Sequence, residues 1–206
     1  MWKSGGALAL GIMAALTGPS SAEVQKAIVA GGCFWCVESD FEAVPGVLDV
    51  VSGYTGGTLE SPTYKNHDGH YEAVEITFDS AVIPYDALIA KFLRSVDVTD
   101  AGGQFCDRGD AYRTAIFALD DAQKQAALAA VAEGEAQLGQ KIVTPVKAAT
   151  KFWIAEDYHQ DYYKGTDYVL TRAGPKKQSS AYKFYREACG RDARVKEVWG
   201  SQALSH

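Results

Sequence analysis

The sequence predicts an α+β fold, a ferredoxin-like two-layer α/β sandwich with a largely irregular C-terminal tail. Stretches typical of strands and helices follow one another in the order β-α-β-β-α-β-α-β, which is the pattern of such a sandwich. The 206 residues are 47% hydrophobic and 22% charged, as expected of one packed domain. After Ala155 the chain is rich in Tyr and charge without clear periodicity, which predicts a tail that wraps the domain with short helices.

The first half of the domain has the clearest elements. An apolar run at 26–30 predicts a buried strand, and the two glycines after it predict a break before a helix over 33–41. A second strand is expected at 47–53, and alternation over 71–78 predicts a third. Apolar residues at helical spacing then predict a helix over 85–95.

The second half is expected to complete the sandwich. A strand is predicted at 113–119, followed by an Ala-rich helix over 120–138 whose first residue, an aspartate, is a good cap. The apolar stretch 143–153 is interpreted as the last core strand. Polar, Gly-rich loops are expected at 54–70 and 97–110.

Residues 1–22 have the pattern of a signal peptide. Lys3 is the only charge, a short apolar stretch follows, and the segment ends in small residues that a signal peptidase accepts. An uncleaved membrane anchor is the alternative, but the apolar run is shorter than the ~20 residues that span a bilayer. We therefore expect an exported protein, located in the periplasm or at a Gram-positive cell surface. Its catalytic domain is expected at 23–165 and a wrapping tail at 166–206.

The overall charge argues against some classes of partner. The chain has 20 basic and 26 acidic residues, a formal net charge of −6. A nucleic-acid surface or an anionic membrane would favour a basic protein. We therefore expect no nucleic-acid partner and no membrane association after signal cleavage. We also expect a monomer.

Cys33 is the strongest chemical signal in the chain. It directly follows the Gly-Gly break, between a predicted strand and a predicted helix. The free N–H groups and the positive dipole end of that helix would favour a thiolate, so a lowered pKa is expected for Cys33. Two buried cysteines that merely pack as small hydrophobic residues are the structural alternative.

Cys36 follows three residues later, in Cys33-Phe34-Trp35-Cys36. On a helix this spacing places both sulfurs on one face, near enough for a disulfide after modest adjustment. Haem attachment would require His where Val37 stands, and a zinc site would require a second close cysteine pair. We therefore expect no metal site and no bound cofactor.

Cys106 and Cys189 are the other two cysteines, and they lie far apart in the sequence. Taken alone, each is more often inert than reactive. Cys106 belongs to a polar loop, however, and Cys189 to a late segment that could carry a second thiol to an oxidised one. Spacing alone does not choose among the three partners for Cys33.

Glu72 is the candidate general acid. It begins a strand in which it shares one face with Val74 and Ile76, whose side chains should point at the core. A carboxyl group beside an apolar face has a raised pKa and can donate a proton near neutral pH. A solvated carboxylate on the strand surface is the alternative.

Other polar residues have weaker signals. Tyr64 and Tyr112 lie on or beside polar loops, where surface packing is a better explanation than catalysis for each tyrosine taken singly. Asp107 could cap a turn or take part in a site, and His159 is expected to be a hydrogen-bonded structural residue. The residues alone thus indicate a thiol redox or thiol nucleophile enzyme with a nearby carboxyl acid.

Six short motifs, taken together, resemble the peptide methionine sulfoxide reductase A family. They occur in the family's order over roughly residues 27–163. The motifs are Gly32-Cys33-Phe34-Trp35, Gly53-Tyr54-Thr55-Gly56-Gly57, Pro62-Thr63-Tyr64, Gly69-His70-Tyr71-Glu72, Asp107-Arg108-Gly109 with Tyr112-Arg113, and Ala155-Glu156-Asp157-Tyr158-His159-Gln160.

The resemblance implies a fold, a reaction and a set of roles. The family has an α+β sandwich fold and reduces the S epimer of methionine sulfoxide, free or in proteins. Cys33 would attack the sulfoxide sulfur and become a sulfenic acid, while Glu72 would protonate the oxygen. The other implied residues are Tyr64, Tyr112 and Asp107 around that oxygen, and Phe34 and Trp35 as the pocket for the S-methyl group.

The resemblance leaves the resolving thiol open, because position 36 is often Gly in the family. We favour Cys36, with Cys189 second and Cys106 third; two exchanges, first to Cys36 and then to Cys189, are a further alternative. A thioredoxin-like protein would reduce the final disulfide.

Two other functions are alternatives to methionine sulfoxide reduction. A thioredoxin-like disulfide oxidoreductase would use the same Cys33-x-x-Cys36 but would not need Glu72, Tyr64 or Tyr112. An exported binding module with a structural disulfide would have an unreactive Cys33.

Overall fold

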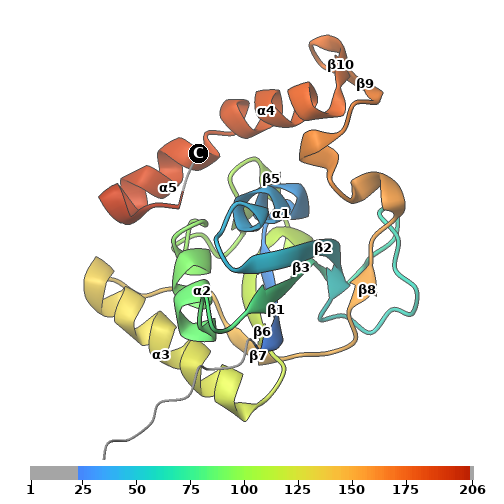
Figure 1. Ribbon diagram of the computed structural model, residues 1–206. Helices are drawn as coiled ribbons and strands as arrows, with labels where there is room; N and C mark the ends of the chain where they lie inside the picture. The colour runs from blue at the N-terminus through green and yellow to red at the C-terminus, as the bar shows by residue number, and fades with distance from the viewer. Residues whose placement is uncertain (1–22, 205–206) are drawn as a thin grey trace, which may run out of the picture.

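A mixed sheet with helices on one face forms the body of the protein (Figure 1). The computed structural model describes residues 23–204, so the predicted signal peptide at 1–22 lies outside the described residues. The sheet order is β7-β6-β1-β3-β2-β8. Its strands are β1 (Val24–Gly31), β2 (Val47–Thr55), β3 (Tyr71–Asp79), β6 (Thr114–Ala118), β7 (Val146–Ala148) and β8 (Trp153–Ile154).

The central four strands confirm the predicted fold class. Strand β1 pairs antiparallel with β3 and with β6, and β2 pairs antiparallel with β3. The resulting order β6-β1-β3-β2 is that of a ferredoxin-like sandwich. The helices that follow β1, β3 and β6 are α1 (Phe34–Glu42), α2 (Tyr85–Leu93) and α3 (Asp121–Leu138), all close to the predicted positions.

The two faces of the sheet pack against different hydrophobic clusters, and successive side chains of β1 belong alternately to one cluster and the other. Ala27 and Val29 belong to the large cluster with the helices, and Ile28 and Ala30 to a smaller cluster on the opposite face. The predicted cap of α3 is confirmed, since the Asp120 side chain accepts from the backbone N–H of Gln123 at 2.7 Å.

The break between β1 and α1 requires glycine at both positions. A Cβ at Gly31 would lie 2.9 Å from side-chain atoms of Val37 and Val96. Gly32 has φ +82°, and a Cβ there would lie 2.6 Å from Cβ of Gln104. The chain can therefore turn tightly from strand to helix only with these small residues, and the turn delivers Cys33 to the N-terminal end of α1.

The prediction of one core strand over 143–153 is wrong. This stretch contains two short strands at opposite edges of the sheet, β7 beside β6 and β8 beside β2. Ala149 and Phe152, between the two strands, pack against the smaller cluster. This stretch is apolar because it crosses one face of the sheet and packs against it. Its apolar residues therefore resemble those of a buried strand.

The two regions predicted to be irregular are more regular than expected. The loop after α2 contains a small hairpin of β4 (Gly103–Gln104) and β5 (Asp107–Arg108). The tail contains the expected short helices together with a hairpin. These elements are β9 (Tyr168–Thr171), β10 (Gly174–Lys177), α4 (Gln178–Ala188) and α5 (Arg191–Trp199).

Buried charges attach the tail to the domain. Asp40 of α1 forms ion pairs with Arg186 at 2.8 Å and with Arg191 at 3.6 Å, and all three residues are buried. Val195 and Trp199 of α5 also belong to the main core. No helix among residues 23–204 is long and apolar enough to cross a membrane.

Replacement of Asp40 by Asn should lower the free energy of unfolding by roughly 3 kcal/mol, because it leaves two buried guanidinium groups short of negative charge. Urea unfolding followed by far-UV circular dichroism would measure the loss. Asp49→Asn, at an exposed position of β2, is the matched control. A loss for Asp40→Asn no larger than that of the control would contradict this account of the tail.

Candidate active site

The residues predicted to be catalytic surround one small pocket. Cys33 lies at its edge, at the N-cap position of α1, and is a free, half-buried thiol. The pocket holds about 70 Å³ and is lined by every predicted catalytic and substrate-binding residue, namely Cys33, Phe34, Trp35, Tyr64, Glu72, Asp107 and Tyr112.

Glu72 occupies the face of β3 that the alternation predicts. Its side chain is 2% exposed, and Val74 and Ile76 of the same face belong to the main core. The backbone N–H of Phe34 donates to Glu72 Oε2 at 3.2 Å, and Tyr112 forms a side-chain hydrogen bond with the same carboxyl group. Glu72 is therefore fixed beside the first turn of α1.

Burial makes Glu72 a proton donor at neutral pH. Desolvation raises the pKa of Glu72 to about 8, and the hydrogen bond from Phe34 opposes that rise only in part. Burial also raises the pKa of Asp107 and of Tyr64, so these groups keep their protons more firmly than in water. The pocket thus offers the O–H groups of Glu72 and Tyr64 to an oxygen atom placed within it.

The pKa values of Cys33 and Cys36 are shifted in opposite directions. The Cys33 thiol donates a hydrogen bond to Cys36, and this bond, followed by burial, raises the pKa of Cys33. The same hydrogen bond lowers the pKa of Cys36 to about 7, and the nearby Arg191 and Arg186 lower it as well. The direction at Cys33 is therefore opposite to the expectation of a lowered pKa, and Cys36 is the more acidic thiol of the reduced site.

Phe34 and Trp35 form an aromatic wall supported from behind. The Trp35 ring stacks on Tyr162 with centroids 3.8 Å apart, and its Nε1–H donates to Nδ1 of His159 at 3.2 Å. His159 is buried, and desolvation lowers its pKa to about 4, so the ring is neutral and accepts this bond. The expectation of a hydrogen-bonded structural His159 is confirmed.

Glu156 connects two further motifs to the site. Its carboxylate accepts the backbone N–H of Tyr64 at 3.0 Å and the hydroxyl of Tyr54 at 3.1 Å. Gln160 makes two hydrogen bonds with the backbone of Ser52 in β2, at 2.9 and 3.0 Å. The segment that carries His159 is thereby held against the sheet.

The four cysteines line a second, larger cavity next to the first. This cavity holds about 440 Å³ and also reaches Arg172, Tyr182, Tyr185, Arg186 and Arg191 of the tail. Cys106 and Cys189 form a disulfide across 83 residues of sequence, whereas Cys33 and Cys36 are free thiols. Neither the predicted partnership of Cys33 with Cys36 nor that with Cys189 is formed in this state.

Sequence reasoning missed the tail residues at the site. Tyr162, Arg186 and Arg191 contact the aromatic wall or the thiol pair, yet they lie where the sequence has no clear period. The only sequence signal was indirect, since Arg191 follows Cys189 by two residues.

Comparison with known proteins places the chain among similar sequences and structures. The family model described as "Peptide methionine sulfoxide reductase" matches residues 25–201. The chain is 49% identical over 187 residues to a protein of Rhizobium meliloti named peptide methionine sulfoxide reductase MsrA 2, covering 90% of this chain and 88% of that protein. A Caulobacter vibrioides protein of the same name is 44% identical, covering 94% and 95%.

Solved structures agree with the sequence comparison. Methionine sulfoxide reductase A of Corynebacterium diphtheriae is 29% identical with a TM-score of 0.64, covering 68% of this chain and 74% of that chain. Reduced Mxr1 of Saccharomyces cerevisiae is 27% identical with a TM-score of 0.65, covering 71% and 88%.

Substitution of Glu72 by Gln should slow the chemical step by ~100-fold at pH 7, since a positioned general acid contributes that order of rate. In the parent chain the rate of methionine formation should fall as pH rises through about 8, where Glu72 loses its proton. Rapid-quench single turnovers across pH 6 to 10 would measure both effects.

Glu75→Gln is the matched control for that substitution, because Glu75 lies on the same strand but on the other face, paired with Lys26. It should behave like the parent chain. Parental rates and an unaltered pH profile in Glu72→Gln would remove Glu72 from the role of acid.

Proposed function

The chain belongs to the peptide methionine sulfoxide reductase family, and we propose that its Cys33 sulfur attacks the sulfur of methionine-S-sulfoxide. As a member of this family the protein is a peptide-methionine (S)-S-oxide reductase, a thiol-dependent oxidoreductase that acts on methionine sulfoxide. The observation that carries the proposal is the pocket in which Cys33 meets the buried, protonated Glu72.

The first step is a two-electron transfer between sulfur atoms. Cys33 Sγ attacks the sulfoxide sulfur, and Glu72 donates a proton to the sulfoxide oxygen. The oxygen then forms a bond to Cys33 Sγ, while its bond to the substrate sulfur and the bond between the two sulfurs both break, so that methionine leaves and Cys33 becomes a sulfenic acid. Tyr64 and Tyr112 would donate hydrogen bonds to the oxygen with Asp107 close by, while Phe34 and Trp35 would enclose the S-methyl group.

Cys36 has a place in this first step. Since the Cys33 thiol donates its hydrogen bond to Cys36, the Cys36 thiolate can accept the Cys33 proton as Cys33 attacks. The attacking sulfur then gains the negative charge that makes it a nucleophile as it forms its bond to the substrate.

Cys36 would also resolve the sulfenic acid. Its sulfur attacks Cys33 Sγ, water leaves, and a Cys33–Cys36 disulfide forms. The existing hydrogen bond between the two side chains supports this choice, because little movement is required. Cys189, bonded to Cys106 in this structure, is the second candidate.

The reaction requires a dithiol from outside the chain but no bound cofactor. We propose a thioredoxin-like protein as the reductant, because a dithiol reduces a protein disulfide by two successive exchanges. We further propose that the enzyme acts as a monomer and without nucleic-acid or membrane partners.

A general disulfide oxidoreductase is not favoured. Disulfide exchange needs the two cysteines of the Cys33-x-x-Cys36 motif, but it has no use for a protonated carboxyl group. Glu72, Tyr64 and Tyr112 line the same pocket as Cys33, and their O–H groups can donate hydrogen bonds to a departing oxygen atom.

We propose that the enzyme repairs exported proteins, on the strength of the signal-peptide pattern at 1–22. Mass spectrometry of the protein recovered from cells should find Glu23 as the N-terminal residue in a periplasmic or surface fraction. A cytoplasmic chain that begins at Met1 would contradict export without affecting the assignment of the reaction.

The reduced chain, mixed with an excess of each methionine sulfoxide epimer and no other reductant, should convert only the S epimer. Cys33→Ser should form no methionine above background, because Cys33 alone of the four cysteines within residues 23–204 lines the pocket that holds Glu72. Chromatography of the quenched mixtures measures both results. Consumption of the R epimer, or methionine formation by Cys33→Ser, would refute the proposed step.

A further inference from the structure

A second cavity shares a wall with the catalytic pocket. It holds about 440 Å³ against about 70 Å³ for the pocket, and Cys33, Trp35, Tyr64 and Asp107 line both spaces. A methionine sulfoxide side chain that occupies the pocket therefore has its main chain, or the residues next to it, at the larger cavity. The groups that line this cavity determine which neighbouring parts of a substrate are bound.

The larger cavity is positively charged although the protein is acidic. Arg172, Arg186 and Arg191 line it, and Asp107 is the only carboxylic acid among its lining residues in the described part of the chain. Burial raises the pKa of Asp107, which weakens the negative charge on that side. Because the whole chain has a formal net charge of −6, this cavity is a local exception that attracts anions.

Two of the three arginines have partners behind the cavity lining. Arg186 pairs with Asp40 at 2.8 Å and with Asp192 at 2.6 Å. Arg191 pairs with Asp40 at 3.6 Å and donates to two backbone oxygens. Both guanidinium groups are buried and belong to the contacts that attach the tail, so their charge is largely compensated within the protein.

Arg172 is the remaining cation of the cavity. It lies in the turn between β9 and β10, and its backbone N–H donates to the hydroxyl oxygen of Tyr185 in α4 at 3.4 Å. Within residues 23–204 no carboxylate pairs with the Arg172 side chain, and the residue is exposed. Its guanidinium group can thus bind a carboxylate through two parallel N–H donors, and the Tyr185 hydroxyl, which lines the same cavity, can donate a third hydrogen bond.

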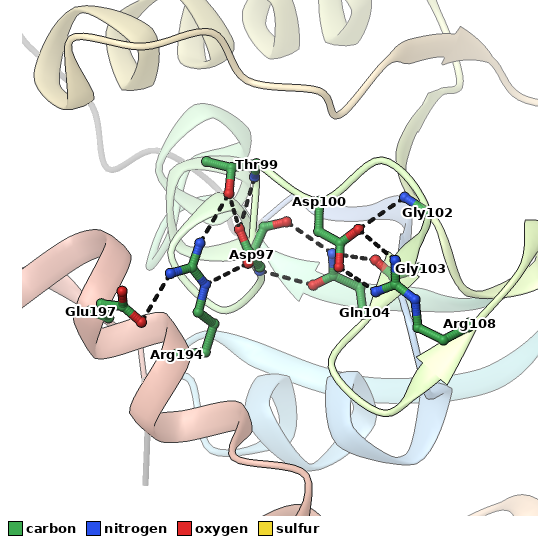
Figure 2. Close-up of polar contacts among 9 residues, drawn as sticks. All are labelled: Asp97, Thr99, Asp100, Gly102, Gly103, Gln104, Arg108, Arg194 and Glu197. Atoms are coloured by element: carbon green, nitrogen blue, oxygen red, sulfur yellow. Dashed lines mark hydrogen bonds and ion pairs between the residues drawn. The ribbon is translucent and has the colours of Figure 1, made fainter.

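The β4–β5 hairpin forms one wall of the cavity, and the loop that carries it is held to α5, as Figure 2 shows. Arg194 of α5 donates to Asp97 Oδ2 at 2.7 Å and to Thr99 Oγ1 at 3.2 Å. Within the loop, Arg108 pairs with Asp100. The wall is therefore in place before a substrate arrives, and little binding energy is lost in ordering it.

Carboxylates are the anions that a methionine sulfoxide substrate itself carries. The free amino acid has its own α-carboxylate, and a peptide has the side chains of neighbouring Asp or Glu residues. An extended peptide advances about 3.5 Å per residue, so a cavity of about 440 Å³ spans one or two residues next to the sulfoxide. A carboxylate that close to the reacting side chain lies within the same cavity as Arg172.

We propose that Arg172 binds a carboxylate of the substrate, supplied by methionine-S-sulfoxide itself or by an acidic residue next to it in a peptide. This inference rests on the proposed function, since it presupposes a sulfoxide held beside Cys33. It makes Arg172 a specificity-determining residue and the larger cavity the subsite for the groups that flank the reacting side chain.

Capped peptides of one length test the preference. Each contains methionine-S-sulfoxide with either Asp or Asn at one of the two positions before or after it, and is mixed with an excess of the reduced chain without other reductant. Chromatography of quenched samples gives the second-order rate constant of methionine formation. At one position or more, the Asp peptide should react about fivefold faster than its Asn partner, as expected of a partly exposed ion pair. High salt should abolish the difference.

Variants of the hairpin assign the preference to one side chain. Arg172→Gln should react with Asp and Asn peptides at equal rates, and Arg172→Glu should favour Lys over Asp at the same position. Lys177→Gln removes one positive charge from the same hairpin at an exposed position that does not line the cavity, so it should keep the parental preference. An Asp preference that persists in Arg172→Gln would contradict the assignment.

Two small substrates distinguish the sources of the carboxylate. N-acetyl-methionine-S-sulfoxide and its methylamide differ only in the α-carboxylate. Faster reaction of the free acid in the parent chain, lost in Arg172→Gln, assigns the α-carboxylate as a ligand, and a preference confined to the peptides assigns the neighbouring side chain. Equal rates for both small substrates and for every Asp and Asn pair would overturn the proposal.

The same measurements separate this inference from the proposed function. Formation of methionine at rates that do not depend on a carboxylate retains the reductase step and rejects the subsite. Absence of methionine from every S-sulfoxide substrate rejects the attack by Cys33, and the subsite with it.

Discussion

The hydrogen bond from the Phe34 N–H to the Glu72 carboxyl group is the contact on which the site depends. It joins the first turn of α1 to β3, and both elements are fixed by the pairing of β1 with β3. Gly31 and Gly32 allow the chain to turn closely enough for this contact, because no larger residue fits there. The nucleophile and the acid are therefore placed by the sheet and a strand-to-helix turn, not by a flexible loop.

Burial determines how charge is distributed at that contact. Desolvation disfavours the charged form of both groups, so Glu72 keeps its proton and His159 remains neutral. Cys36 is the more acidic thiol of the pair, and Arg191 and Arg186 of the tail lower its pKa. The proton donor that a sulfoxide oxygen requires and the group that can accept the proton of the attacking Cys33 thiol are thus held in adjacent but electrically different surroundings.

Local patterns predicted what local interactions determine. The strand, the Gly-Gly break and the helix around Cys33 were predictable, as was the inward face of Glu72, because each depends on periodicity or on backbone geometry within a few residues. The run 143–153 was mispredicted because a segment that crosses a sheet face is as apolar as a strand. The Cys106–Cys189 disulfide joins residues 83 positions apart, and the electrostatic interaction of Cys36 with Arg191 joins residues 155 positions apart. Sequence spacing does not reveal contacts over such separations.

Arg191 connects the C-terminal tail to the active site. Its guanidinium reaches the Gly31 oxygen at the end of β1, pairs with Asp40 of α1, and lies over the Phe105 ring at 4.9 Å. A single buried cation therefore contacts the strand before the nucleophile, the helix after it and the loop that carries Cys106.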